Sequence, residues 1–293
     1  MAEEFKQKLK DGQPCNDKGY FDSYKCNVYG GIMPTKFQKM FDDADGSELH
    51  SKAEAIHSSS MLAYNFFHWI DSSSFMFDDV EYTQVFFEIQ MKTLINSNRP
   101  ANMDVVLIDK ECKNILFIES KFTEFFDPKP WKLSDKYTKG NAYNKDVDWD
   151  YIITEIKKKL KEYRYKEGIK QLTTHLFGIA NLCKKKALDW FNTNNSLRLD
   201  EPFSKYSVKF INLIFEPQKE SFNNEHNSYE KYKELFGEAQ KVIDDRIKIG
   251  DNSLNIIWKS YTDLWEVMKN QINKDLRDFL WQRYMRFAEG ATE

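Results

Sequence analysis

Two neighbouring apolar stretches carry charged residues of the types that can act on a phosphate. Asp104 opens the stretch "DVVLID" at residues 104–109, and Glu119 and Lys121 close the stretch "NILFIESK" at residues 114–121. A strand can hold charged side chains near its ends at little cost, because the ends reach water. Two carboxylates and an ammonium in this arrangement therefore indicate a site for a cation and for phosphate chemistry.

The expected strand geometry brings these groups together. Side chains alternate across a strand, so Glu119 and Lys121 share one face. In an antiparallel hairpin the beginning of the first strand lies against the end of the second, which places Asp104 beside Glu119. Carboxylates this close repel one another, and a hard divalent cation such as Mg²⁺, bound by oxygen ligands and waters, relieves the repulsion.

Lys121 has two interpretations from its position. Beside a bound cation, its ammonium could orient or deprotonate a water molecule and offset negative charge in a transition state. In the simpler alternative, Lys121 and Glu119 form a weak ion pair at the end of a strand, and Asp104 is another surface charge. Metal binding distinguishes the two.

The composition predicts a globular protein. The chain has 293 residues, of which 41% are hydrophobic and 15% aromatic, and its net charge is −3. Such a charge gives no overall attraction to nucleic acid or to an anionic membrane, so any polyanion must meet a local patch. The four scattered cysteines favour neither a disulfide scaffold nor a zinc module, and no stretch is apolar enough to span a membrane. We expect a cytoplasmic protein with no membrane contact.

The order of elements predicts an α/β fold. Strands are expected at 83–94, 102–109 and 114–122 as an antiparallel meander, and again at 206–217 and 254–258. Helices are expected at 47–70, 151–192, 227–247, 261–271 and 273–288, with a short one near 35–41. We interpret residues 1–293 as a single domain with a core at about 47–217, an irregular N-terminal arm at 1–46 and a C-terminal α/β extension at 218–293.

One polar stripe of the helix expected at 47–70 has two open interpretations. Glu54, Ser58, Met61 and Asn65 recur at intervals of four, three and four residues, which places them on one helix face. This face either contacts solvent or points towards the site.

The pattern D-x14-E-x-K across a β-hairpin, flanked by helices and followed by another strand, resembles the PD-(D/E)xK nuclease superfamily. The match runs from about Ser47 to Pro217, and "IESKFTE" resembles its restriction endonuclease-like bacterial members. The sequence departs from the motif at Met103, where the name of the superfamily has proline. The resemblance implies a restriction endonuclease-like core with a mixed β-sheet between α-helices, and hydrolysis of DNA with Mg²⁺, for which Mn²⁺ substitutes.

The resemblance also implies roles for the motif residues. Asp104 and Glu119 would hold the metal, the carbonyl of Ser120 would join them, and Lys121 would be catalytic. A homodimer is an open alternative, since cutting both strands of DNA can require two chains. A protein of the same fold that binds nucleic acid or a partner without cleaving is the alternative function.

Two further positions fit the superfamily less closely. Many members have an acid in the first core helix, and Glu54 could take that role as a metal ligand, although Glu88 in the first strand competes for it. Many also have a glutamine or lysine in the helix after the motif, and Gln171 is the catalytic candidate there. His175 lies one turn beyond Gln171, but it is left out because a lone helix histidine is more often a surface or core-edge residue.

Overall fold

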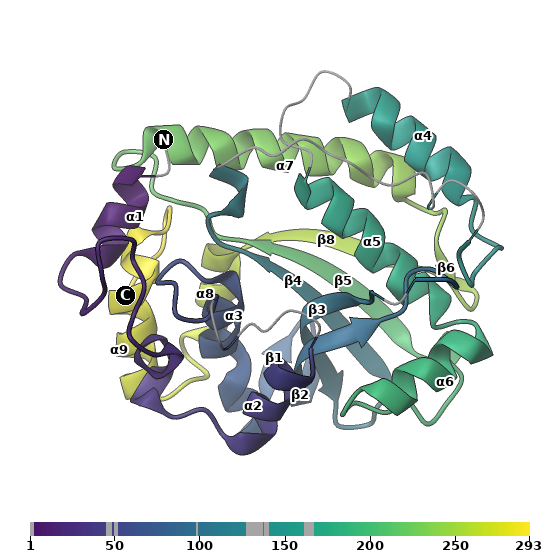
Figure 1. Ribbon diagram of the computed structural model, residues 1–293, viewed down its shortest axis with the longest axis horizontal. Coiled ribbons are helices and arrows are strands. Elements are labelled where there is room, and N and C mark those ends of the chain that lie inside the picture. The colour runs from purple at the N-terminus through teal and green to yellow at the C-terminus, as the bar shows by residue number, and fades with distance from the viewer. Residues whose placement is uncertain are drawn as a thin grey trace.

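A six-stranded mixed β-sheet forms the centre of the molecule (Figure 1). The computed structural model describes residues 3–44, 49, 52–97, 99–126, 137, 141–160 and 167–293. The strand order is β1-β2-β3-β4-β5-β8. The strands are β1 (Phe75–Phe77), β2 (Val80–Met91), β3 (Ala101–Asp109), β4 (Asn114–Lys121), β5 (Ser207–Ile214) and β8 (Asn255–Ser260).

The pairing of the strands confirms the expected mixed sheet. β1 to β4 pair antiparallel in succession, while β5 pairs parallel with β4 and β8 pairs parallel with β5. The apolar stretches rich in Val, Ile and Phe are the residues that suit a buried pleated surface. The α/β fold class, with a mixed sheet flanked by helices, is therefore confirmed.

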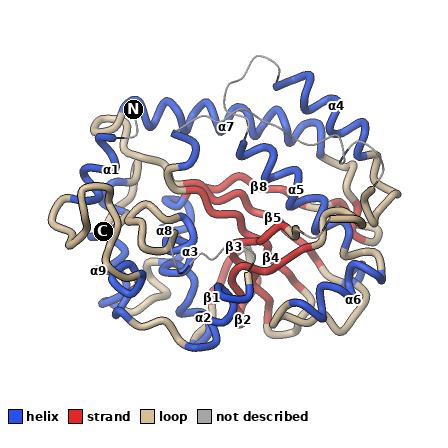
Figure 2. The backbone as a smooth tube through the Cα atoms, viewed as in Figure 1, coloured by secondary structure: helices blue, strands red, loops and turns tan. Residues whose placement is uncertain are grey.

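Helices cover both faces of the sheet (Figures 1 and 2). On the face that presents Glu119 lie α5 (Glu167–Asn181) and α7 (Asn223–Ile243), which approach β2, β3 and β8. On the opposite face, which presents Ser120, lie α3 (Ser59–Phe67) and α8 (Tyr261–Met268). The central strands are thus buried from both sides, as parallel pairs usually are.

The remaining elements lie around this core. They are α1 (Glu3–Lys10), α2 (Thr35–Asp43), α4 (Trp149–Lys159), α6 (Lys185–Asn194), α9 (Lys274–Arg283), and a two-stranded sheet of β6 (Lys248–Ile249) and β7 (Asn252–Ser253). None of the helices in the described residues is long and apolar enough to cross a membrane.

Two expected helices differ from the structure. The helix expected at 47–70 is shorter, because Ser58 caps it by accepting a hydrogen bond from the Met61 backbone N–H, and α3 begins only at Ser59. Residues 47, 48, 50 and 51 lie outside the described residues. The region expected at 151–192 contains the separate helices α4, α5 and α6, and residues 161–166 lie outside the described residues.

The N-terminal arm is more ordered than predicted. It contains α1 as well as the expected short helix, α2. Phe5 of α1 is fully buried, and its ring meets the rings of Phe122, Phe126 and Phe215 at centroid distances of 5.9, 5.5 and 5.6 Å. The arm therefore packs directly behind the end of β4, while the division of the chain into one domain stays a prediction.

We expect Phe5→Ala to lower the free energy of unfolding by about 3–5 kcal/mol, because it removes a buried ring and leaves a cavity. Urea denaturation followed by circular dichroism would measure the loss. Ile32→Ala is the control, since Ile32 is 76% exposed. An equally small effect of both substitutions would show that α1 does not belong to the stable core.

Candidate active site on the central strands

Three carboxylates lie side by side on β2, β3 and β4. The β2–β3 register places Glu88 beside Asp104, since Phe87 pairs with Val105 on one side of this position. The β3–β4 register pairs Val105 with Ile118, and one further step places Asp104 beside Glu119. We call Glu88, Asp104, Glu119, Lys121 and His175 the carboxylate site.

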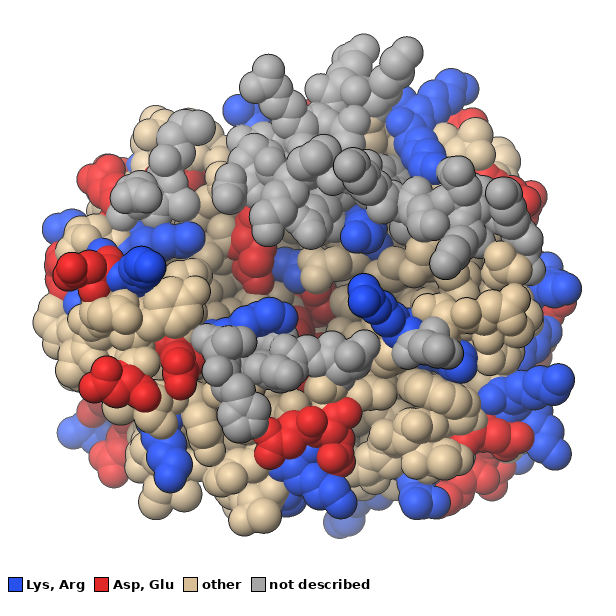
Figure 3. All heavy atoms as spheres, in the orientation of Figure 1, with Lys and Arg blue, Asp and Glu red and all other residues tan. Residues whose placement is uncertain are grey.

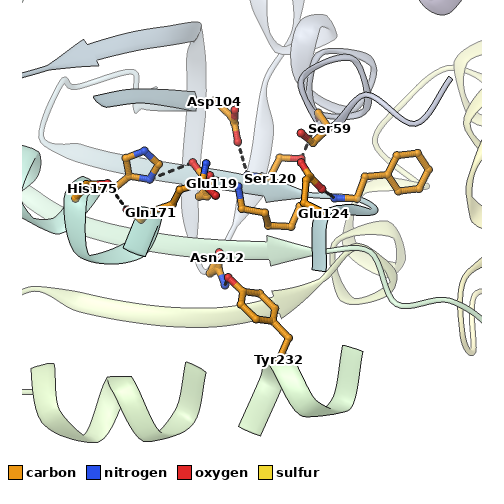
Figure 4. A network of polar contacts seen from close by, with 12 residues as sticks. Ser59, Asp104, Glu119, Ser120, Glu124, Gln171, His175, Asn212 and Tyr232 are labelled. Carbon is orange, nitrogen blue, oxygen red and sulfur yellow. Dashed lines mark hydrogen bonds and ion pairs between the residues drawn. The ribbon is translucent and has the colours of Figure 1, made fainter. Parts of the chain in front are cut away.

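Lys121 and Glu119 form a buried ion pair (Figure 4). Their side chains are only 5% and 3% exposed. The chain contains a second pair with the same spacing, Glu111 and Lys113, whose side chains are 68% and 71% exposed. A weak surface ion pair therefore describes residues 111 and 113, whereas the pair in the carboxylate site must offset the loss of water around both charges.

Asp104 lies within β3, three residues after the strand begins, and it is half-buried. One of its oxygens accepts a hydrogen bond of 2.6 Å from the Ser120 backbone N–H. Burial raises the pKa of Asp104 well above its usual value, and the nearby charges of Glu119 and Glu88 raise it further. The site thus holds more negative charge than Lys121 neutralises, which favours a further cation.

The ammonium of Lys121 is held in its charged form. Burial acts to lower the pKa of Lys121, but the carboxylates of Glu119, Glu124 and Asp104 outweigh it and raise the pKa above its ordinary value. Glu124 is itself fixed, because its Oε2 accepts hydrogen bonds from the backbone N–H groups of Phe122 and Thr123 at 2.7 and 3.0 Å. In this arrangement Lys121 serves as a fixed positive charge.

His175 belongs to the site, although it was not predicted from the sequence. Its Nδ1 lies 3.1 Å from Oε2 of Glu119, and the side chain is 5% exposed. Burial lowers the pKa of His175, so the neutral ring is favoured, and the ring bonds to the carbonyl of Asn102. The Glu119 carboxylate acts in the opposite direction and raises the pKa of the ring.

Nδ1 of His175 and Oε2 of Glu119 are thus buried and in contact, 3.1 Å apart. Neither has a hydrogen-bond partner among the described residues. Such groups are costly when they are unpartnered, and a cation shared between them would satisfy both. This is the observation that best fits a metal at this place.

The other residues singled out from the sequence are placed differently. Gln171 lies one turn before His175 on α5 and is half-buried (Figure 4). Glu54 lies in a turn before α3, and its backbone carbonyl accepts a hydrogen bond from Phe21. The prediction that it stands on a helix face is wrong, because the helix begins later.

Asn65, the last residue of the polar stripe expected at Glu54, Ser58, Met61 and Asn65, contacts neither solvent nor the carboxylate site. The Asn65 side chain is fully buried and donates hydrogen bonds to the Asn27 carbonyl at 2.9 Å and the Tyr284 hydroxyl at 3.0 Å. The Ser120 side chain points to the opposite face of the sheet, where its hydroxyl meets the Ser59 carbonyl at 3.1 Å and the Tyr261 hydroxyl at 2.7 Å. Only the backbone of Ser120 is on the side of Asp104.

Glu88, rather than Glu54, stands next to Asp104 in the sheet. Its backbone φ is 51°, in the left-handed region, although it lies within β2 and is buried. A side chain other than glycine rarely adopts this conformation, and such strain is often found at functional sites. No periodicity in the sequence indicates this bend.

Asn212 and Tyr232 complete the surroundings. Asn212 of β5 pairs with Glu119 across the parallel ladder, and its amide lies 3.5 Å from the hydroxyl of Tyr232 on α7. Burial raises the pKa of Tyr232 to about 12. A polar Asn within the apolar stretch "KFINLIF" is the signal in the sequence that could have indicated this position.

Acidic and basic side chains are interspersed over the described part of the face shown in Figure 3, and both kinds are visible in a hollow near its centre.

A model of the family described as "Restriction Endonuclease associating with ARP" matches residues 2–285. Comparison with curated proteins and with solved structures found no match. The family match includes all the strands of the central sheet.

We expect Lys121→Met to lower the free energy of unfolding by about 3 kcal/mol at pH 7 in a chelating buffer, because it leaves Glu119 buried beside other carboxylates without its cation. Lys113→Met, in the exposed pair with the same spacing, should cost about 0–1 kcal/mol. Urea denaturation of both variants would measure the difference.

The double variant Glu119→Gln/Lys121→Met should recover part of the loss, since it removes the buried charge together with its partner. Equal losses for the two lysine variants would show that the Glu119–Lys121 pair behaves as a surface pair.

Proposed function

The chain belongs to the family described as "Restriction Endonuclease associating with ARP", and we propose that it is a metal-dependent deoxyribonuclease of the PD-(D/E)xK type. The observation that carries this proposal is the buried Glu119–Lys121 pair with Asp104 beside it in the hairpin. The description of the family also names an association with ARP, and we propose the same association for this chain.

The donor atoms of the carboxylate site suit Mg²⁺ or Mn²⁺. Asp104 supplies a carboxylate whose pKa is raised by burial and further by the nearby charges of Glu119 and Glu88. Glu119 supplies a buried oxygen, Oε2, that has no hydrogen-bond partner in the described part of the chain, and Nδ1 of His175 lies 3.1 Å from it. A bound divalent ion would polarise a phosphate oxygen and make a bound water more acidic. Oxygen ligands favour Mg²⁺, and an imidazole nitrogen would make Mn²⁺ an effective substitute.

The residues of the chain supply positioning and charge. Lys121, kept positive by the surrounding carboxylates, would face the negative charge that develops on a phosphate during attack. The ion pair fixes the direction of the Glu119 carboxylate, and the hydrogen bond from Ser120 fixes that of Asp104. A pure DNA-binding protein has no use for a row of carboxylates, which repel phosphate.

Several further features are predicted for this chain. They are the joining of the Ser120 carbonyl and Glu54 to the metal, a catalytic role for Gln171, the pairing of two chains in a homodimer, and a cytoplasmic location. Glu88 is the better candidate than Glu54 for a further acidic group, because it lies beside Asp104.

We expect the protein to degrade DNA with Mg²⁺ or Mn²⁺, and Lys121→Ala to reduce the rate by about 10² or more, because a preorganised charge at the reacting phosphate is lost. Lys113→Ala should leave the rate unchanged. Cleavage of plasmid, linear and single-stranded DNA would be compared at a temperature where circular dichroism shows that all proteins are folded.

Lys121→Arg should restore little activity, since a planar guanidinium does not fit the place of a compact ammonium. Equal rates for wild type and Lys121→Ala would contradict the proposed mechanism. Binding of DNA without cleavage by the wild type would favour the alternative, a nuclease-fold protein that only binds.

The contacts of α5 give a second test. We expect His175→Ala to weaken Mn²⁺ binding about 10-fold or more, because His175 touches Glu119. Gln171→Ala should change the affinity less, since Gln171 acts on water or phosphate in the superfamily pattern. Calorimetric titration of both variants with Mn²⁺ would measure the affinities, and equal losses would show that the two side chains have the same relation to the metal.

A further inference from the structure

A second group of metal-ligand atoms lies away from the carboxylate site. Glu216, His226 and Glu230 each offer one ligand atom, and these atoms all lie within 4.8 Å of one another. Among the residues that the structure describes, no other three His, Cys, Asp or Glu side chains have ligand atoms this close together. We call these three residues the α7 site.

Two elements position the three side chains. His226 and Glu230 lie four residues apart on α7, which places them on one face of the helix. Glu216 follows the end of β5, and its backbone carbonyl accepts a hydrogen bond of 2.9 Å from the N–H of Glu289. The next residue, Pro217, pairs with Ala288 in an isolated bridge. The C-terminal segment therefore fixes the backbone that carries Glu216.

The contacts of His226 prepare it as a ligand. The residue is 8% exposed, and its Nδ1 lies 3.0 Å from the carbonyl oxygen of Pro217. A carbonyl can only accept, so Nδ1 carries a proton, and Nε2 is the nitrogen left to bind a metal. A ligand histidine in a metal site usually has its other nitrogen held in this way.

Glu216 is held by a similar chain of contacts. The hydroxyl of Tyr229 donates a hydrogen bond to its carboxylate. The indole Nε1 of Trp258 in turn donates to the Tyr229 hydroxyl at 3.3 Å. Two of the three ligands are therefore oriented by neighbours that leave a lone pair available.

The charge of the α7 site also favours a cation. Two carboxylates flank one imidazole, and Lys233 is a nearby positive residue that acts on Glu216. The Lys233 ammonium lies over the ring of Tyr229, 5.6 Å from its centroid. Glu230 is exposed, so an ion could reach the site from solvent.

We propose that Glu216, His226 and Glu230 bind one transition metal ion, with Zn²⁺ as the expected ion. One imidazole nitrogen and two carboxylate oxygens are common ligands of Zn²⁺, with a water in the fourth position. Mg²⁺ prefers oxygen ligands alone and retains its waters, so it should compete poorly here. The ion would join the end of β5 to the first turns of α7.

This site shares no ligand with the carboxylate site. The same two elements nevertheless serve both, because β5 provides Asn212 and α7 provides Tyr232 beside Glu119. The proposal does not depend on DNA cleavage, since it rests on a separate set of ligands.

The test is equilibrium dialysis of the full chain against Zn²⁺ with a large excess of Mg²⁺ to occupy the carboxylate site, and the visible spectrum of Co²⁺ as a second readout. We expect one Zn²⁺ per chain, and Glu230→Gln to weaken it at least about 10-fold, since it removes one ligand of three. Glu230 is exposed, so this variant should fold normally, and His226→Gln should weaken binding further.

Three control variants locate the ion. Glu220→Gln, at an exposed position close by, should leave Zn²⁺ binding unchanged. Glu119→Gln and His175→Asn should also leave it unchanged, because they alter only the carboxylate site. The proposal is overturned if the wild type binds no Zn²⁺, if Glu230→Gln and His226→Gln bind it as tightly as the wild type, or if Glu119→Gln abolishes binding while Glu230→Gln retains it.

Discussion

The burial of charge on β3 and β4 constrains the rest of this fold. Glu119 and Lys121 are almost fully removed from water, and two charges in that condition need each other and further polar partners. The partners come from every element that covers this face: Asp104 from the neighbouring strand, His175 from α5 and Tyr232 from α7. A slip of β3 by one residue would separate Asp104 from Glu119, so the register of the sheet and the composition of the site depend on each other.

Strands and their pairing could be predicted from the sequence because the signals are local. The apolar stretches and the short polar turn after Asp109 predict the β3–β4 hairpin and thereby place Asp104 beside Glu119. The contact between His175 and Glu119 joins residues 56 positions apart, and helical periodicity cannot show which buried residue faces which strand. The start of α3 differs from the helix expected at 47–70, because the Ser58 side chain caps the helix and α3 begins only at Ser59.

Two of the E-x-K segments of this chain show why the motif needs its surroundings. Glu111 and Lys113 have the spacing of Glu119 and Lys121, and both pairs make an ion pair. The first pair lies in and beyond a turn, where water solvates both charges. The second pair lies at the buried end of a central strand. Burial, which three residues of sequence do not reveal, separates a solvated turn from a site that can hold a metal.

Three features on neighbouring strands of the sheet lower the stability of the fold. Glu88 adopts a strained backbone, Asp104 has a raised pKa, and the buried atoms Oε2 of Glu119 and Nδ1 of His175 have no hydrogen-bond partner among the described residues. Hydrophobic residues at these positions would allow the same sheet to form without those costs, because the fold needs only apolar side chains between β4 and the helices. Natural proteins retain such costs mainly where function requires them. The concentration of all three features around Glu119 supports the proposal that these strands bind a cation, since one bound ion would reduce the repulsion among the carboxylates and coordinate both Oε2 of Glu119 and Nδ1 of His175.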